Sequence, residues 1–213
     1  TIIVPLSGGK DSRYIVSMLK ELNYHKVICF TYGNPKNKEV LLSEKIAKKL
    51  GFDWCFVEYN DSKYNCYKDN DVIEYFKYSH NYVSYPHFQD FIAIRELIYS
   101  KKIPFDSVVV PGHSGDLLAG SHIAKIYLNK EIKDHFNIYD IIRKQHYNLH
   151  TSNRYFDQHL IKKIAHYFKD LKIDEISNFI DLTDAWNIAN RQSKYIVNST
   201  KVYDFFKLDW RLP

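Results

Sequence analysis

The first sixty residues alternate short apolar runs with helical patterns. Residues 2–6, 26–32 and 54–59 are mostly apolar, and runs of this length predict buried strands. Between them, residues 13–22 and 38–50 place apolar side chains at the spacing of one helix face. Strands that alternate with helices in this way are typical of parallel strands joined by crossover helices. The sequence therefore predicts an α/β fold.

The rest of the chain adds another strand and several helices. We expect a Rossmann-like parallel sheet of about five strands, with helices on both faces. Residues 1–122 would form this core, with an insertion at about 60–85, and residues 123–213 would form a helical extension packed on it in the same domain. The further predicted elements are a short helix around 72–78, a helix at 89–100, a strand at 106–110, and helices at 138–147, 157–171, 173–180 and 183–197.

The composition is that of a globular protein, with 45% hydrophobic and 26% charged residues. The chain has no run of about 18 apolar residues, so we expect no membrane-spanning helix. The net charge of +5 comes from basic residues scattered among acidic ones, which weighs against a nucleic-acid partner. The three cysteines lack metal-binding spacing and the N-terminus lacks a signal-peptide pattern, so we expect a cytoplasmic protein. Because the chain starts inside an apolar run without a methionine, we expect a piece of a longer protein.

Glycines are few and clustered. The chain has seven, about half the usual share, and five of them fall at residues 8–9 and 112–120. This concentration predicts unusual backbone angles or the close approach of a ligand at these two places. Gly51 directly follows the predicted helix at 38–50 and suits its C-cap.

The first glycine cluster lies in the segment Ser7–Ser12, Ser-Gly-Gly-Lys-Asp-Ser, between a predicted strand and a predicted helix. The two glycines let backbone N–H groups turn toward an anion, and the helix N-terminus adds further N–H groups. The two serines can donate their hydroxyls to phosphate oxygens. Asp11 would repel a phosphate unless a cation lay between them, so Mg²⁺ is implied. Lys10 faces either a phosphate or solvent.

This segment resembles the SGGxDS pyrophosphate loop of the adenine nucleotide alpha hydrolase-like (PP-loop ATP pyrophosphatase) superfamily. Asparagine, GMP and NAD synthetases and tRNA-thiolating enzymes are members. The resemblance implies a HUP-like fold and a reaction in which ATP is cleaved between its α and β phosphates. AMP is transferred to a carboxylate or carbonyl oxygen, and a nucleophile, commonly ammonia, then displaces it. It implies ATP and Mg²⁺ as cofactors, bound by Ser7, Gly8, Gly9, Lys10, Asp11 and Ser12, with Thr31, Tyr32 and Gly33 as adenine-side contacts.

The second glycine cluster, Pro-Gly-His-Ser-Gly-Asp-Leu-Leu-Ala-Gly after the strand at 106–110, resembles the SGxGxDExxGG segment of the asparagine synthetase synthetase domain. On this match Gly112 and Gly120 hold family glycines, and Asp116 holds the aspartate that helps to bind Mg²⁺-pyrophosphate. Because parallel strands end at the same sheet edge, Asp11 and Asp116 are expected in one crevice as the metal ligands.

The second segment also departs from the family. His113 stands where the family usually has a catalytic glutamate, and Leu117 stands where an acidic residue often follows the aspartate. His113 could take a proton from incoming ammonia, or it could be a polar loop residue or a phosphate donor. The resemblance therefore supports ATP use better than it supports aspartate as the substrate.

Other candidate residues lie outside the two loops. The segment 186–213 is similar to the end of the synthetase domain, where a family lysine reaches the pyrophosphate. Lys194 is the first candidate for this lysine and Arg191 is the second. Both residues also suit a solvated helix face. Arg13 could hold a phosphate or form an ion pair. His87, Gln89 and Asp90 could face a substrate. For Asp90 we prefer a second interpretation, in which it caps the helix that follows.

The resemblance implies an ATP-dependent amidotransferase or ligase similar to the asparagine synthetase synthetase domain. His113, Lys194 and Asp116 would be catalytic, and the partner would be a small-molecule acceptor with a carboxylate or carbonyl. Ammonia would come from solution or from a glutaminase part outside this chain. Three alternatives remain: amidation of a sugar or surface-polysaccharide precursor, a non-catalytic nucleotide-binding module, and a tRNA-modifying enzyme, which would need a basic groove and reactive cysteines.

Overall fold

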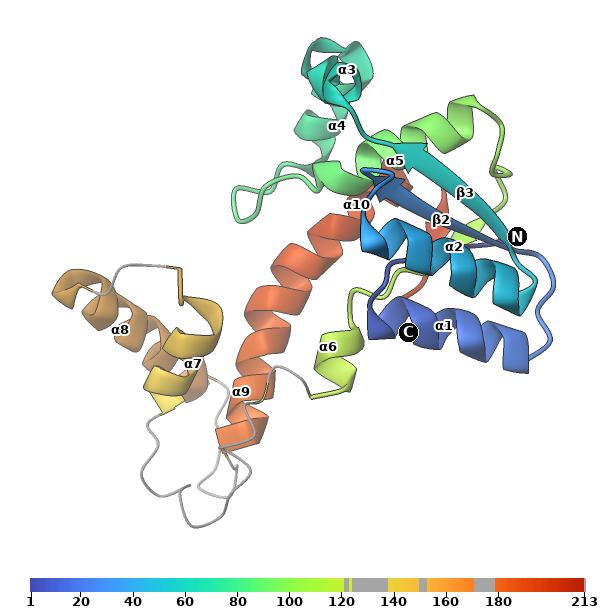
Figure 1. Cartoon of the computed structure of the whole chain (residues 1–213). Coiled ribbons are helices and arrows are strands. Elements are labelled where there is room, and N and C mark those ends of the chain that lie inside the picture. Colours follow the sequence, from blue (N-terminus) through green and yellow to red (C-terminus); the bar gives the residue numbers. More distant parts are fainter. Residues whose placement is uncertain (121–122, 124–137, 150–152, 171–178, 213) are drawn as a thin grey trace. The chain divides into compact units, whose positions relative to one another are not determined.

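The computed structural model describes residues 1–120, 123, 138–149, 153–170 and 179–212 (Figure 1). The chain folds as two compact units, one formed by Thr1–Gly115 with Lys194–Pro213 and the other by Asp116–Ser193. The first unit holds the sheet, and the second is helical. Within the described residues, no helix combines the length and the apolar character needed to span a bilayer.

The sheet has five parallel strands in the order β3-β2-β1-β4-β5, which confirms the predicted α/β fold. The chain runs from the central strand β1 outward through β2 to β3, and then returns to the other side of β1 for β4. The strand order therefore reverses between β1 and β4, and in open α/β sheets ligands bind outside the strand ends at such a point. The strands are β1 (Ile2–Pro5), β2 (Val27–Gly33), β3 (Asp53–Glu58), β4 (Val108–Val109) and β5 (Asp209–Trp210).

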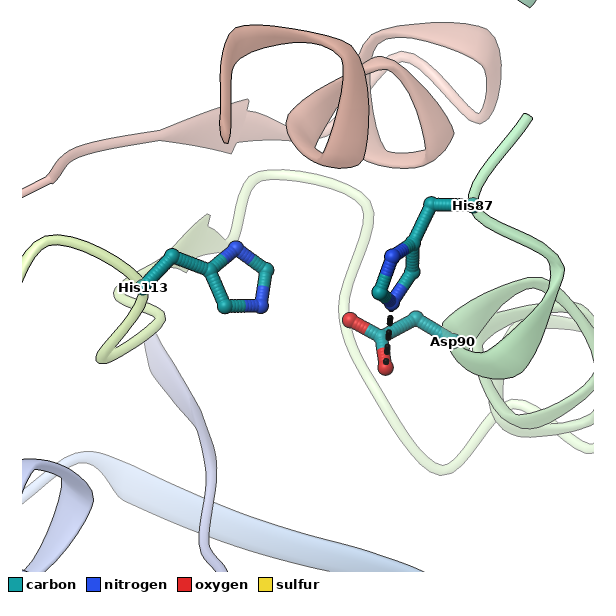
Figure 2. Close-up of side chains that lie close together, drawn as sticks. All are labelled: His87, Asp90 and His113. Carbon is teal, nitrogen blue, oxygen red and sulfur yellow. Dashed lines mark ion pairs between the residues drawn. The ribbon is translucent and has the colours of Figure 1, made fainter. Parts of the chain in front are cut away.

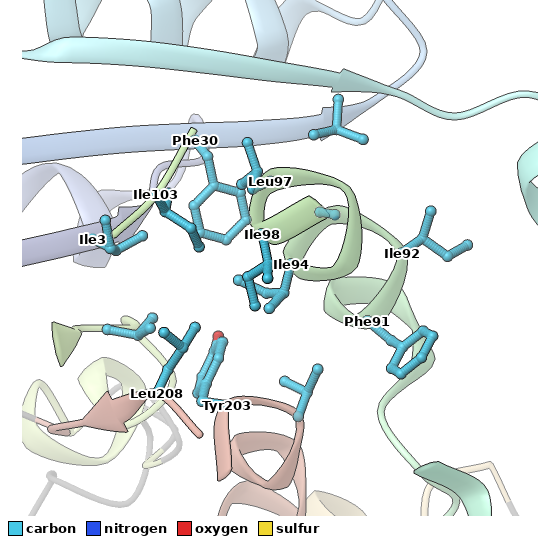
Figure 3. Close-up of a cluster of buried hydrophobic side chains, with 14 of the residues drawn as sticks. Ile3, Phe30, Phe91, Ile92, Ile94, Leu97, Ile98, Ile103, Tyr203 and Leu208 are labelled. Carbon is cyan, nitrogen blue, oxygen red and sulfur yellow. The ribbon is translucent and has the colours of Figure 1, made fainter. Parts of the chain in front are cut away.

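Helices cover both faces of the sheet because successive strand residues point to opposite sides. Ile3 packs into a buried cluster with residues of α5 and α10, and Figure 3 shows this cluster between the sheet and these helices. Its neighbour Val4 packs into a second cluster with residues of α1 and α2. The helices of the first unit are α1 (Lys10–Glu21), α2 (Lys38–Leu50), α3 (Asp61–Tyr64), the 3₁₀ helix η1 (Asn65–Lys68), α4 (Asn70–Ser79), α5 (Phe88–Tyr99) and α10 (Val197–Phe205).

The second unit has its own small core. Ile142, Leu160, Ile164 and Trp186 are buried together and come from three different helices. The predicted helices at 138–147 and 157–171 are present with slightly different ends, whereas the one predicted at 173–180 lies mostly outside the described residues. The helices are α7 (Ile138–His146), α8 (Arg154–Asp170) and α9 (Phe179–Asn187), with α6 (Gly115–Leu118) and the π-helix η4 (Ile188–Ile196) at the borders between the units.

Local sequence explains where the helices begin and end. The prediction of a helix at 38–50 is confirmed by α2. The Asn37 side chain caps its start by accepting a hydrogen bond from the Glu39 amide at 3.0 Å, and Gly51 ends it at φ 74°. The prediction that the first helix starts at residue 13 is wrong: α1 starts at Lys10, after an extended Gly9. The polar residues 10–12 carry no apolar signal, so hydrophobic spacing could not detect them.

Three other predictions need correction, and one strand was not located from the sequence. The fourth strand is limited to Val108–Val109, and β5 was not predicted because two residues are too few to form a pattern. The insertion contains α3 and η1 in addition to the predicted helix around 72–78, which is α4. The helix predicted at 183–197 is three consecutive pieces, α9, η4 and α10.

Candidate functional site

A pocket of about 250 Å³ opens at the point where the strand order reverses. The ends of β1 and β2, the first turn of α1, the start of α2, Asp90 of α5 and the loop after β4 form its wall, and all of them belong to the first unit. Of the sequence-predicted candidates, the pocket lining includes Ser7, Gly9, Asp11, Ser12, Thr31, Tyr32, Asp90, Gly112 and His113.

The two glycine-rich loops touch each other beside this pocket. A Cβ atom placed on Gly112 would lie 3.2 Å from the Asp11 Cβ and 3.2 Å from the Ser12 amide nitrogen. At Gly115 the fit is closer still, because a Cβ there would lie only 2.4 Å from the carboxyl carbon of Asp11. No side chain larger than hydrogen fits at residue 115 without displacing Asp11. The glycine clustering thus reflects direct packing of one loop on the other.

Hydrogen bonds within the first loop fix its conformation, and the N-terminal amides of α1 lie beside the pocket. The Ser7 amide donates to the Ser12 Oγ, and the Gly9 amide donates to the Ser7 Oγ, each at 3.1 Å. The N–H groups in the first turn of α1 have no acceptor within the helix, and Gly9 at the N-cap has no side chain to accept from them. An anion at this helix N-terminus would be stabilised by these groups and by the helix dipole. The loop therefore fits a phosphate.

Asp11 supplies the carboxylate that a phosphate-bound Mg²⁺ would need. Its side chain is half-buried in the pocket wall, where it lies against Gly115. An oxygen donor beside a phosphate-binding helix terminus suits Mg²⁺, which prefers carboxylates together with phosphate oxygens. In the second unit, Asp116 lies 3.8 Å from the Arg191 guanidinium. A metal shared by Asp11 and Asp116 stays a prediction.

The end of β2 forms another part of the wall. The Thr31 hydroxyl is buried, 2.7 Å from the Leu6 carbonyl oxygen and 2.7 Å from the Ser43 Oγ, so it pins β2 to the end of β1. Gly33 ends β2 at φ 124°, a conformation that favours glycine. It borders a second, adjoining pocket of about 620 Å³. That pocket is lined by Tyr32, Gly33, Asn37, Glu39, Tyr59, Tyr64, Tyr85, Pro86, His87, Phe88, Gln89 and Tyr195.

Asp90 is buried next to the first pocket, with 2% of its surface exposed. The hydroxyls of Tyr32 and Tyr203 donate to its two oxygens at 2.6 and 2.7 Å. Burial, together with the negative charge of Asp90, raises the pKa of both tyrosines, so they remain protonated donors. The preferred interpretation of Asp90 as a helix cap is wrong, because its oxygens accept from these tyrosines and not from the amides of α5.

His113 and His87 lie on either side of this carboxylate (Figure 2). The His87 Nε2 is 3.7 Å from an Asp90 oxygen. The His113 Nδ1 is 2.9 Å from the Ser199 Oγ, and that hydroxyl gives its one proton to the Ile196 carbonyl at 2.6 Å. This arrangement fits a neutral His113 that donates its Nδ1–H to Ser199 and carries its lone pair on Nε2. Sequence reasoning missed Ser199 because it is one of many polar residues on a helix.

The other candidate residues, Arg13, Gln89, Lys194 and Lys10, do not line the first pocket. The Arg13 Nε donates to the Gly9 carbonyl at 3.0 Å and so braces the first loop. The backbone oxygen of Gln89 accepts from the Tyr59 hydroxyl. The backbone oxygen of Lys194 accepts from the Ser84 Oγ at 3.3 Å, and neither Lys194 nor the exposed Lys10 is among the described residues that line the first pocket.

Comparison with known proteins agrees with this geometry. No curated protein matches the chain. The family model described as asparagine synthase matches residues 2–194, which includes both loops and the sheet strands β1 to β4. This family consists of ATP-dependent ligases, and its match confirms the resemblance stated from the two loops. The chain therefore belongs to the asparagine synthase family.

Proposed function

We propose that this protein is a ligase that splits ATP into AMP and pyrophosphate to activate a carboxylate or carbonyl oxygen for attack by ammonia. The observation that carries the proposal is the contact between the two glycine-rich loops beside a pocket at the strand-order reversal. A nucleotide there would have its phosphates at the N-terminus of α1.

The chain's own residues would act mainly by position and charge. The N–H groups in the first turn of α1 would bind and orient phosphate oxygens. Asp11 would hold Mg²⁺, which supplies charge neutralisation on the phosphates when bound. Asp116 and Lys194 would add a second carboxylate and a cation, and Arg191 would act beside them, as expected from the sequence resemblance.

The adjoining pocket favours a sugar-like acceptor as a second candidate. Six of its lining residues are tyrosine or phenylalanine, and among the described residues that line it none is a lysine or arginine. Aspartate carries two carboxylates, and binding the one that does not react calls for a cationic partner. Flat aromatic side chains instead suit the apolar face of a sugar ring. Amidation of a sugar acid or a surface-polymer precursor therefore fits this wall better than amidation of aspartate.

The test is to incubate the protein with ATP, Mg²⁺, ammonium and a panel of amino acids and sugar acids, and to identify the phosphorus products. We expect AMP and pyrophosphate, with the largest release for a sugar acid. ADP with inorganic phosphate would contradict the proposed chemistry. Tight ATP binding without turnover for any acceptor would favour a non-catalytic nucleotide-binding module.

A matched pair of variants connects this result to the first loop. Asp11→Asn removes the charge proposed to hold Mg²⁺, and we expect Mg²⁺-ATP to bind more weakly by about 1–3 kcal/mol. Glu21→Gln changes an exposed carboxylate at the other end of α1 and should leave binding unchanged. Equal affinity in both variants would remove Asp11 from the site.

A further inference from the structure

Three side chains with metal-binding chemistry converge beside the pocket. His87 is the N-cap residue of α5, Asp90 follows one turn later, and His113 comes from the loop after β4. One ligand atom from each lies within 4.8 Å of the other two. Figure 2 shows the far edge of the His113 ring turned toward Asp90, with His87 next to the carboxylate. All three belong to the first unit.

Within the part of the chain that the structure describes, no lysine or arginine forms an ion pair with the buried carboxylate of Asp90. The Asp90 side chain is 3% exposed, and among the described residues its ion pair is with His87, at 3.7 Å. The tyrosine hydroxyls that donate to it are neutral. Burying a carboxylate without a cation is costly, so buried charges are usually paired or bound to a metal ion.

The hydrogen bonds around the cluster orient it for coordination. Histidine ligands usually donate their second ring N–H to an oxygen, which fixes the ring and its tautomer. His113 does this toward Ser199, which directs its Nε2 lone pair away from that helix. Each oxygen of Asp90 accepts one tyrosine hydroxyl and retains a further lone pair.

We infer that His87, Asp90 and His113 bind a divalent first-row transition metal of the Zn²⁺ type, distinct from the Mg²⁺ of the triphosphate. Two imidazoles with one carboxylate suit such an ion, whereas Mg²⁺ prefers oxygen ligands alone. Tetrahedral Zn²⁺ with bonds of about 2.0–2.1 Å places its ligand atoms roughly 3.3 Å apart. The His87–Asp90 separation of 3.7 Å is already close to that value, and no pair needs to close by more than about 1.5 Å.

Asp90 and His113 both line the ATP pocket. An ion bound between them would therefore have a coordination position open toward that pocket. In that position the ion could bind an acceptor oxygen where the family has its glutamate. His113 would then be a ligand, and the expectation that it accepts a proton from ammonia would not hold. Metal binding needs no ATP, so this inference stands or falls independently of the proposed reaction.

The experiment is calorimetric titration of the chelator-treated full chain with Zn²⁺ in the absence of nucleotide, followed by Co²⁺ absorption spectroscopy. We expect one site, and His87→Ala and His113→Ala should each weaken it about tenfold or more. His25→Ala changes an exposed histidine and serves as the matched control. Excess Mg²⁺ should not displace Zn²⁺.

The absence of Zn²⁺ binding would overturn the inference. Binding that is the same in His87→Ala, His113→Ala and His25→Ala would also overturn it, since the ion would then lie elsewhere. The test uses the histidine variants and not Asp90→Asn, because Asp90 accepts hydrogen bonds from two buried tyrosines and its substitution could impair folding. Thermal unfolding of each variant verifies that the fold is intact.

Discussion

The loop after β1 and the loop after β4 border the same pocket but are held in different ways. Neighbouring residues hold the first loop: Ser7 and Ser12 bond to its amides, and Arg13 bonds to its Gly9 carbonyl. His113 in the second loop depends on Ser199, which is 86 residues away in the sequence. The hydrogen bonds that shape the first loop are therefore local, whereas the one that holds His113 depends on tertiary packing.

The largest effect is expected where the two loops touch. In Gly115→Ala the new Cβ would lie 2.4 Å from the Asp11 carboxyl carbon and displace it. Because a misplacement of about 1 Å at a reacting centre can cost roughly a hundredfold in rate, we expect pyrophosphate release to fall by about that factor. Steady-state assays on Gly115→Ala and on its neighbour Ser114→Ala measure the difference. Equal rates would show that the contact between the loops does not position Asp11 for the reaction.

A smaller and more selective effect is expected at Ser199. Ser199→Ala removes the acceptor of the His113 Nδ1–H, so the ring is no longer fixed in one tautomer. Loss of such a partner typically lowers metal affinity by 10–100-fold, and we expect a fall of about tenfold in Zn²⁺ affinity with unchanged ATP affinity. Calorimetry with each ligand tests this, and Ser199→Thr should restore the affinity. A parallel loss of ATP affinity would contradict the separation of the two sides.

The smallest effect concerns the tyrosines that hold Asp90. The pKa of Tyr203 is raised above its ordinary value of 10.0, chiefly by burial. Below pH 10 both the folded and unfolded chains keep this proton, and above it only the folded chain does. The free energy of unfolding should therefore fall as pH rises above about 10.

Tyr203→Phe should lessen this pH dependence and lower the free energy of unfolding at neutral pH by about 1–2 kcal/mol, because Asp90 loses one donor. Urea unfolding at several pH values measures both effects. Tyr24→Phe, at an exposed position, is the control, and identical pH profiles for the two variants would show that Tyr203 does not titrate as the structure implies.

The parts of the structure that the sequence predicted are those with a local signal. Strands and helices of the first sixty residues have clear hydrophobic spacing, and Gly51 ends α2 as its position indicated. The two loops were recognised because their glycines and aspartates stand close together in the sequence. The start of α1 was missed because its first turn is polar, and β5 was missed because it has two residues.

The side chains that surround Asp90 and His113 could not be predicted in the same way. Tyr32, Tyr203 and Ser199 come from β2 and α10, and only the folded sheet brings them to the pocket. Nothing in the sequence near Asp90 distinguishes a carboxylate bonded to tyrosines from one that caps a helix. The adjoining aromatic pocket is likewise assembled from the end of β2, the start of α2, Tyr59 directly after β3, α3, the segment 85–89 and η4.

A crystal structure of the protein with ATP and Mg²⁺ would test the proposed nucleotide site most directly. We expect the phosphates to lie at the N-terminus of α1, between the first loop and Gly112, with the Asp11 carboxylate bound to the metal. A nucleotide bound elsewhere, or one whose metal is out of reach of Asp11, would contradict this expectation.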